Sequence, residues 1–229
     1  MPLKLLSPLL FLCLILLSGC GLFHTPPPGT VEVEEEDVEE RWYMDRSTIT
    51  NENWGNYLAW IQREFSTEAD VYQRALPDQD VWETVYERRG RDFSSPEVFF
   101  LQQNANFPVV GITYDQAQHF AQWRTNRVQD RTGENIVYKI PEYEHFERVA
   151  ERYGFVDIGA TDRIIPQREL PSTPEGGFRG LCVNVSEMTQ TEGLAAGGNW
   201  ENPSSQCPVR VEYDSPENWL GFRCIAIKE

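Results

Sequence analysis

The sequence predicts an α+β fold in which helices come early and short strands and loops come late. Helical apolar periods with helix-start signals occur between residues 51 and 153, and short apolar segments bounded by Pro or Gly are typical of strands. Residues 155–219 are rich in Gly, Pro, Ser and Asn and keep no helical period. The chain has no internal repeat, so we expect a single domain over residues 47–229.

Two helices are expected in the first part of this domain. Asn51 can cap a helix whose apolar stripe comprises Trp54, Leu58, Ile61 and Phe65. Residues 113–116 (TYDQ) form a capping box for a second helix, which places on one face Ala117, Phe120 and Ala121. Residues 108–112, which lead into this helix, are apolar and are expected to be extended.

A strand and a third helix are expected next. Residues 137–140 form a short strand, and Pro141 is suited to the first turn of the helix that follows. The buried stripe of that helix comprises Phe146, Val149, Ala150 and Tyr153. Residues 222–227 are expected to close the chain as a strand.

Residues 1–20 resemble the signal of a bacterial lipoprotein. An apolar run over residues 9–17 follows a single Lys, and Ser18 and Gly19 are small residues directly before Cys20. The run is shorter than the roughly 20 residues that span a bilayer. The resemblance implies removal of residues 1–19 and acylation of Cys20. The alternatives are an ordinary secretory signal with an incidental Cys, or a membrane anchor.

Residues 20–46 are expected to be a lipidated tether. Residues 26–29 (PPPG) cannot build regular structure, and seven of the nine residues 32–40 are acidic. A binding tail for a basic partner is the alternative to a spacer. Gly21, rather than Asp, follows Cys20, which by the sorting rule for such lipoproteins implies the periplasmic face of an outer membrane.

The net charge is −16, and the signal carries one Lys and no acid. Such a negative chain repels nucleic acid and anionic headgroups, so we expect neither as a partner. Membrane attachment must therefore come from the N-terminal lipid, and stable anchoring takes more than one acyl chain.

Five cysteines are present, of which Cys13 leaves with the signal and Cys20 is lipidated. An oxidising compartment then favours one disulfide and one odd thiol among the remaining three, Cys182, Cys207 and Cys224. Three pairings are possible. We expect Cys224 to pair with Cys182 or Cys207, as a structural cross-link rather than a catalytic thiol.

The common catalytic motifs are absent from the sequence. It contains no Gly-rich phosphate loop, no nucleophile elbow and no CxxC. The three histidines, His24, His119 and His145, stand apart, so no histidine metal site or triad is expected. The residues alone indicate an exported α+β domain.

Six short segments occur in a defined order. They are residues 49–54 (ITNENW), 108–123 (PVVGITYDQA to Trp123), 138–147 (YKIPEYEHFE), 184–189 (NVSEMT), 197–200 (GGNW) and 220–224 (LGFRC). Together they resemble the formylglycine-generating enzyme, or sulfatase-modifying factor, family over residues 47–227. The resemblance implies a compact fold related to C-type lectin-like domains, with much irregular structure and loops that often bind calcium.

The same resemblance bears on activity. The oxidases of that family hold copper with two cysteines, five positions apart, just after the segment that corresponds to GGNW. Counted forward from that segment, these positions are Asn202 and Cys207 in this chain. Counted back from Cys224, however, Cys207 lies nearer to the position of a structural cysteine of the family. One Cys and one Asn cannot form a two-thiolate site for Cu(I). We therefore do not expect copper, and Cys207 is the one candidate catalytic residue.

The resemblance also implies a calcium site and several core residues. Glu187 matches a carboxylate that helps to bind calcium, with part of the shell completed by the backbone carbonyls of Val183 and Val185. The alternative is that Glu187 is a solvated acid that binds no metal ion. Arg223 is expected to bridge carbonyls or a carboxylate in the core. Three aromatic residues are expected to be core: Trp54, Trp123 and Trp200.

These observations favour a non-enzymatic lipoprotein with a binding or structural role in the cell envelope. Lipoproteins of the gliding-motility and type IX secretion machinery use the family's fold in this way. The expected partner is another envelope protein or a glycan. The alternative is a copper-dependent formylglycine-generating oxidase that acts on a cysteine of a sulfatase-like substrate, with Cys207 as the metal-binding thiol.

Overall fold

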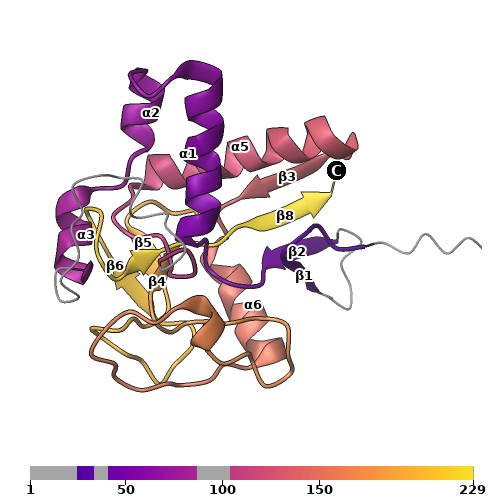
Figure 1. Ribbon diagram of the computed structural model, residues 1–229. Coiled ribbons are helices and arrows are strands. Elements are labelled where there is room, and N and C mark those ends of the chain that lie inside the picture. Colours follow the sequence, from indigo (N-terminus) through magenta and orange to yellow (C-terminus); the bar gives the residue numbers. More distant parts are fainter. Residues whose placement is uncertain (1–24, 34–40, 87–103, 229) are drawn as a thin grey trace, which may run out of the picture.

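The computed structural model describes residues 25–33, 41–86 and 104–228 (Figure 1). The signal segment 1–19, Cys20 and residues 34–40 of the acidic run lie outside the described residues. Strands in the described part form two four-stranded sheets, and helices cover both faces of the first sheet. The α+β class expected from the sequence is confirmed.

The first sheet brings the two ends of the domain together. Its strand order is β1-β2-β8-β3 and every pairing is antiparallel. The strands are β1 (Thr30–Val33), β2 (Trp42–Asp45), β8 (Ile225–Lys228) and β3 (Ile136–Lys139). Tyr43 pairs with Ala226, so the hairpin of β1 and β2 is joined to the last strand.

The prediction of a solvated tether over residues 20–46 is wrong for β1 and β2. All four residues of β2 are buried. Trp42 and Met44 pack into one core cluster, whereas Tyr43 packs into the cluster on the opposite face. This period-two alternation specifies a strand buried on both faces. The sequence of β2 is apolar at three consecutive positions and follows a dense acidic run, so it shows no polar–apolar alternation that would predict a strand.

Helix α1 (Asn51–Phe65) begins one residue earlier than predicted. Its N-cap is Thr50, which forms a capping box with Asn53, while the predicted cap, Asn51, is buried in the first turn. The amide Nδ2 of Asn51 donates to the backbone carbonyl of Asn104 at 3.0 Å. The predicted stripe is buried at Trp54, Leu58 and Ile61, but Phe65 is 54% exposed.

Helix α5 (Tyr114–Thr132) starts at the predicted capping box, in which Thr113 accepts from the backbone of Gln116. Its predicted apolar face is buried, and the helix ends at Gly133 with φ of 71°. Helix α6 (Tyr143–Tyr153) follows Pro141 with Glu142 as N-cap. Phe146 and Val149 of its predicted stripe are buried, and the other two members, Ala150 and Tyr153, are half-buried.

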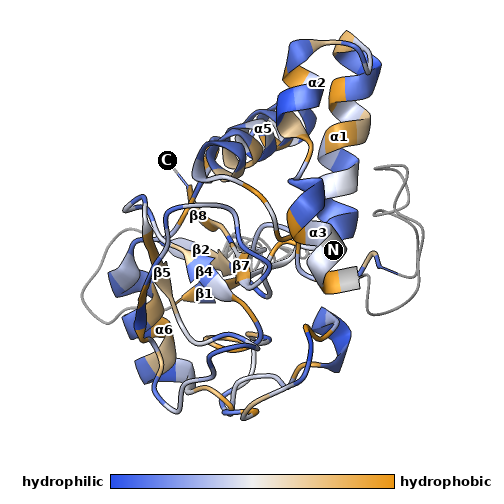
Figure 2. Cartoon of the chain, turned by 90° about the vertical axis from the view of Figure 1, so that its left-hand side faces the viewer, coloured by the Kyte–Doolittle hydropathy of each residue, from blue (hydrophilic) through white to orange (hydrophobic). Residues whose placement is uncertain are grey.

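Two short helices were not identified from the sequence. They are α2 (Asp70–Ala75) and α3 (Gln79–Tyr86). Helix α2 lies beside α1, and the two extend away from the sheets in both views (Figures 1 and 2). The side chain of Gln116 donates to the carbonyls of Arg74 and Leu76, both at 2.8 Å, and so joins the end of α2 to the start of α5.

The second sheet lies in the loop-rich part of the chain, where irregular structure was expected. Its strand order is β6-β5-β4-β7, with only β4 and β7 parallel. The strands are β4 (Ser186–Met188), β5 (Leu194–Ala196), β6 (Arg210–Glu212) and β7 (Leu220–Gly221). A 3₁₀ turn, η2 (Gln167–Glu169), interrupts the long connection before them.

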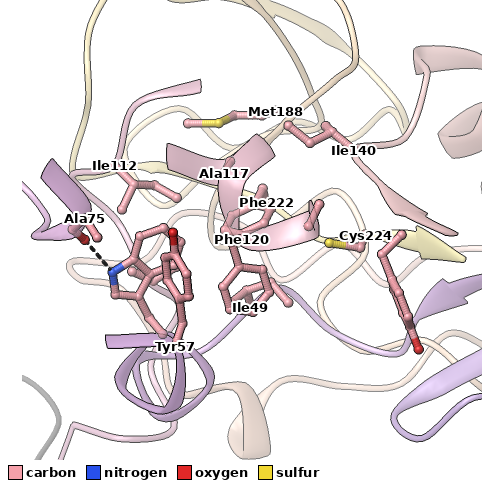
Figure 3. Close-up of a cluster of buried hydrophobic side chains, with 14 of the residues drawn as sticks. Ile49, Tyr57, Ala75, Ile112, Ala117, Phe120, Ile140, Met188, Phe222 and Cys224 are labelled. Carbon is pink, nitrogen blue, oxygen red and sulfur yellow. Dashed lines mark hydrogen bonds between the residues drawn. The ribbon is translucent and has the colours of Figure 1, made fainter. Parts of the chain in front are cut away.

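The largest core cluster lies between α1, α5 and the first sheet (Figure 3). The ring of Trp54 stacks on Phe120 at 5.4 Å, and Phe120 meets Phe222 edge to face at 5.6 Å. The indole N–H of Trp54 donates to the carbonyl of Ala75 at 3.1 Å, which satisfies the only polar atom of that side chain. The prediction that tryptophans fill the core is confirmed for Trp54, whereas two others are half-buried at the edges of clusters, Trp123 and Trp200.

Candidate functional site

One disulfide joins two distant points of the loop-rich region. Cys182 and Cys207 are bonded, with their Cα atoms 5.5 Å apart, whereas Cys224 is a buried free thiol. The expectation that Cys224 belongs to the disulfide is therefore wrong. Cys182 and Cys207 pack with the core cluster beside α6, but Cys224 packs with the cluster beside α1 and α5. The first sheet separates the two clusters, a relation that sequence spacing cannot reveal.

The turn after GGNW is held closed by Asn199. Its Oδ1 accepts from the backbone N–H groups of Glu201 and Asn202 at 3.1 and 2.8 Å. Its Nδ2 donates to the hydroxyl of Ser186 at 3.0 Å. A Cβ at Gly198 would lie 2.6 Å from the backbone nitrogen of Ser204, so this turn is packed too tightly for a side chain there.

The two positions that the resemblance assigns to copper cysteines lie in this region but do not form a thiolate pair. Asn202 is exposed and carries no sulfur. Cys207 is half-buried, and its sulfur is bonded to Cys182. Because a soft metal ion needs free thiolates, Cys207 cannot serve as such a ligand while the disulfide is intact.

Arg223 and Glu187 form an ion pair at the centre of the domain. Both side chains are completely buried, with Nε of Arg223 2.5 Å from Oε2 and Nη2 2.8 Å from Oε1 of Glu187. Nη1 donates to the backbone carbonyl of Asp45 at 3.1 Å. The predicted role of Arg223 as a bridge between a core carboxylate and a carbonyl is confirmed. Burial raises the pKa of the Glu187 carboxyl, and the charge of Arg223 opposes that shift.

The same pair bears on the calcium prediction. Both carboxylate oxygens of Glu187 accept from Arg223, and the carbonyl of Val183 accepts from the backbone N–H of Val185 at 2.9 Å. Over residues 25–33, 41–86 and 104–228, no group of three or more His, Cys, Asp or Glu side chains is placed to hold a metal ion. Calcium ligation by Glu187, Val183 and Val185 stays a prediction.

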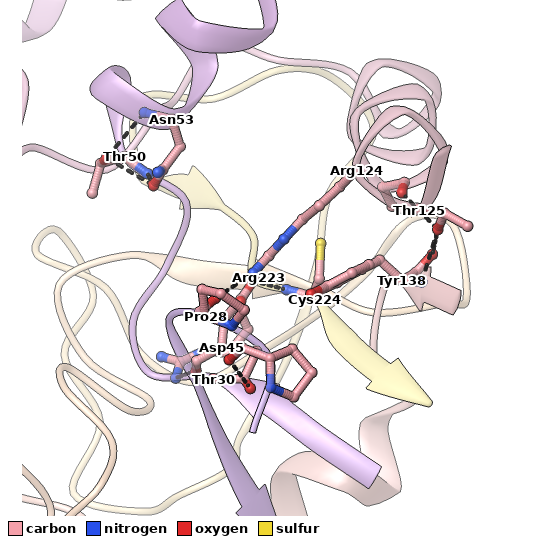
Figure 4. A network of polar contacts seen from close by, with 12 residues as sticks. Pro28, Thr30, Asp45, Thr50, Asn53, Arg124, Thr125, Tyr138, Arg223 and Cys224 are labelled. Carbon is pink, nitrogen blue, oxygen red and sulfur yellow. Dashed lines mark hydrogen bonds and ion pairs between the residues drawn. The ribbon is translucent and has the colours of Figure 1, made fainter. Parts of the chain in front are cut away.

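A second charge pair, formed by buried Asp45 and partly exposed Arg124, lies next to Cys224 (Figure 4). Oδ2 of Asp45 accepts from Nη1 of Arg124 at 2.7 Å and from the backbone N–H of Cys224 at 2.9 Å. The guanidinium of Arg124 also lies 4.1 Å above the ring of Tyr138. Burial, reinforced by the Asp45 charge, raises the pKa of the Cys224 thiol far above its usual range. Cys224 is thus a protonated core residue and not a nucleophile.

The histidines occupy separate elements in the described chain. His119 is exposed on α5, whereas Nδ1 of His145 accepts from the backbone N–H of Glu142 at 3.1 Å and completes the capping box of α6. His24 lies outside the described residues.

Among the helices that are described, none is both long and apolar enough to cross a bilayer.

Across the residues that the structure describes, these features define an α+β domain with two small sheets, a loop-rich second half and one disulfide. Residues 26–163 match the family described as sulfatase-modifying factor enzyme 1-like domain, and the chain belongs to this family. The match begins before β1, in agreement with a domain that includes the first hairpin. The resemblance identified from the six sequence segments is confirmed.

Two solved structures are similar to the chain. PvdO from Pseudomonas aeruginosa has a TM-score of 0.49 and 15% identity, with 88% of this chain and 92% of that chain covered. The crystal structure of CarF has a TM-score of 0.50 and 13% identity, with 82% of this chain and 87% of that chain covered. At such identity the likeness to CarF concerns the fold alone. No protein of curated function matches the sequence significantly.

Proposed function

We propose that this protein is a lipid-anchored lipoprotein of the outer membrane, with its domain in the periplasm, and that the domain binds or supports another envelope component without oxidising it. The observation that carries the non-oxidising role is the bond between Cys207 and Cys182, and the lipid anchor is supported by the signal-like segment that ends at Cys20. The bond engages the only sulfur at the two positions that correspond to the family's copper ligands.

Among the described residues, Cys224 is the remaining thiol, and it gives no alternative route to oxidation. Cys224 is fully buried, and its raised pKa keeps it protonated. Oxidation of a substrate cysteine by a copper oxidase needs thiolates that bind the metal and a surface that the substrate can reach. Neither condition is met by a protonated thiol in the core.

The test of catalysis is a peptide oxidation assay on the full chain. The protein is supplied with Cu(I), before and after reduction of its disulfide, and with a sulfatase-type Cys-x-Pro-x-Arg peptide whose mass is followed. We expect an unchanged peptide in both states, while a copper-competent family member converts its cysteine to an aldehyde. Aldehyde formation that is lost in Cys207→Ser would establish the alternative function, a copper-dependent oxidase.

The test of anchoring is metabolic labelling with palmitate in a Gram-negative host. We expect label in the wild-type chain and in Cys13→Ala, because Cys13 lies within the removed signal. Label should be absent from Cys20→Ala, which lacks the acylated thiol. Equal labelling of Cys20→Ala would overturn the lipoprotein assignment.

A further inference from the structure

The edges of the two sheets differ in whether their outward backbone groups are already bonded. The edges of the first sheet are β1 and β3, and those of the second are β6 and β7 (Figure 1). The outward N–H of Tyr138 in β3 donates to the hydroxyl of Thr125 at 2.8 Å. In β1, the carbonyl of Glu32 accepts from the hydroxyl of Tyr153 at 3.0 Å. Both residues of β7 are buried, so three of the four edges in the described part are covered by the chain itself.

The edge at β6 is open. The N–H of Tyr213 donates to the carbonyl of Gly193 at 3.0 Å, so the odd-numbered residues of this segment, which include Val211, face β5. The N–H and C=O groups of Arg210 and Glu212 then point away from the sheet. Both residues are exposed, and no other described residue bonds to these backbone groups. Such an edge is able to accept a further strand.

The side chains on this edge suit a second copy of the same strand. Arg210 and Glu212 lie on one face of β6, because successive side chains of a strand alternate. When two copies pair antiparallel about a two-fold axis through Val211, each Arg210 lies opposite the Glu212 of the other copy. In that register the outward N–H and C=O groups of these two residues also bond each other. Charge and hydrogen bonding therefore select the same register.

The residue on the axis adds an apolar contact. Val211 packs half-buried against the core cluster beside α1 and α5. In the two-fold register it meets its own copy as a non-hydrogen-bonded pair, in which the Cα atoms lie about 4.5 Å apart. Pro208, the outward-facing residue before Arg210, has no N–H and ends the ladder. A ladder this short buries far less than the roughly 800 Å² per partner of a stable complex, so we expect weak and reversible association.

We propose that the edge of β6 pairs with the same edge of a second copy of this chain, in an antiparallel register centred on Val211. The guanidinium of Arg210 lies 4.1 Å above the ring of Tyr143, which fixes its charge on one face of the strand. The net charge of −16 opposes association, but exposed charges more than about 8 Å apart are largely screened at physiological ionic strength. The contact goes beyond the proposed function and does not depend on the lipid anchor, because it uses only β6.

The experiment traps the pair covalently through Val211→Cys in the full chain. A non-hydrogen-bonded pair has a Cα separation at which a disulfide forms. The protein is held in a glutathione redox buffer, dimer is followed by non-reducing electrophoresis, and peptide mapping locates the bond. We expect a dimer linked between the two introduced cysteines. Val71→Cys replaces a valine that is 36% exposed on α2, and it should dimerise much more slowly although its side chain is the more accessible.

Charge reversals in the Val211→Cys background test the register. Arg210→Glu places acids opposite each other and Glu212→Arg places bases opposite each other, so each should slow cross-linking about tenfold. The double reversal should restore the rate. An equimolar mixture of the two single reversals should give mainly the heterodimer, identified by its mass, because each strand then faces the opposite charge. Arg131→Glu changes the net charge as Arg210→Glu does, at an exposed residue of α5, and should have no effect.

Four results would overturn the proposal. They are cross-linking no faster than in Val71→Cys, equal rates before and after charge reversal, a heterodimer no more abundant than random mixing gives, and linkage in cells to a different protein, which would assign the edge to a foreign strand. Arg210→Glu also removes the contact with Tyr143, whereas Glu212→Arg leaves that contact in place. Slower cross-linking in Glu212→Arg, with stability to urea unchanged, therefore reports on the contact between copies and not on folding.

Discussion

Arg223 places a full positive charge where no water can reach it. Its guanidinium is compensated by both oxygens of Glu187 and by the backbone carbonyl of Asp45. Removal of either charged partner would leave the other ion buried and uncompensated, which is far more costly than the net value of the pair. Glu187 lies in β4 of the second sheet, and Arg223 lies two residues before the start of β8 in the first sheet. The ion pair therefore connects the two sheets.

The first prediction concerns this pair. We expect Arg223→Met and Glu187→Gln each to lower the free energy of unfolding by roughly 3–5 kcal/mol, measured by urea denaturation. The double variant should recover part of the loss, because no isolated ion then remains in the core. Single variants within about 0.5 kcal/mol of wild type would contradict the buried pair, as would strictly additive losses.

The second prediction concerns the thiol of Cys224. The thiolate is the reactive form, and burial raises the pKa of this thiol far above its usual range. We expect iodoacetamide to leave Cys224 unmodified in the native protein and to alkylate it fully in denaturant, as followed by mass spectrometry of the peptide that contains it. Rapid alkylation under native conditions would show that the thiol is accessible.

At the scale of elements, the start of α6 depends on an uncharged histidine. The ring of His145 accepts a hydrogen bond from the backbone of Glu142 and meets the ring of Trp42 edge to face at 4.7 Å. Only the neutral imidazole has an acceptor nitrogen. Desolvation by burial lowers the pKa of His145 below its ordinary value of 6.5, with the Glu142 charge opposing.

The third prediction is the resulting pH dependence. The unfolded chain binds a proton at His145 near pH 6.5, while the folded chain does so only at lower pH. The stabilisation is therefore complete above about pH 6.5 and is lost progressively as the pH falls toward the folded pKa. His145→Gln keeps a capping-box residue but cannot titrate, so its free energy of unfolding should fall less between pH 7 and pH 5.

The control for this prediction is His119→Gln, because His119 is exposed on α5. Urea denaturation at each pH compares the three proteins. If His145→Gln has the same pH dependence as wild type, protonation of His145 does not contribute to acid sensitivity.

At the scale of the whole molecule, the disulfide restrains a region with little regular structure. The bond between Cys182 and Cys207 spans a sequence separation of 25 residues, which includes β4 and β5. Cross-linking a loop of this length reduces the conformational entropy of the unfolded chain. In the loop-entropy treatment this adds about 3.5 kcal/mol to the free energy of unfolding.

The fourth prediction follows from that restraint. The double variant Cys182→Ala/Cys207→Ala should be less stable than wild type by about 2–4 kcal/mol in urea denaturation. Reduction of the wild type should produce a similar loss, whereas reduction of the double variant should have no further effect. Equal stability of the oxidised and reduced wild-type protein would contradict a structural role for the bond.

The sequence anticipated much of the fold and part of the candidate site. The capping box at Thr113 and the role of Arg223 could be predicted because each rests on local residues or on a short motif. The partner of Cys207 could not, because it depends on which face of the first sheet each cysteine occupies. The open edge of β6 was likewise invisible, since β6 is three residues long and gives almost no periodic signal.

By itself, the sequence determined the α+β class, three helices with their apolar stripes, and membership of the sulfatase-modifying factor family. Periodicity, capping residues and ordered motifs are local properties, and a chain carries them before it folds. Only the tertiary structure decided that β2 is a central strand, that Cys224 stays unpaired and that β6 is an open sheet edge. Each of these depends on packing between segments that are far apart in the chain. There the burial of apolar side chains and the pairing of buried charges outweigh the local preferences of the sequence.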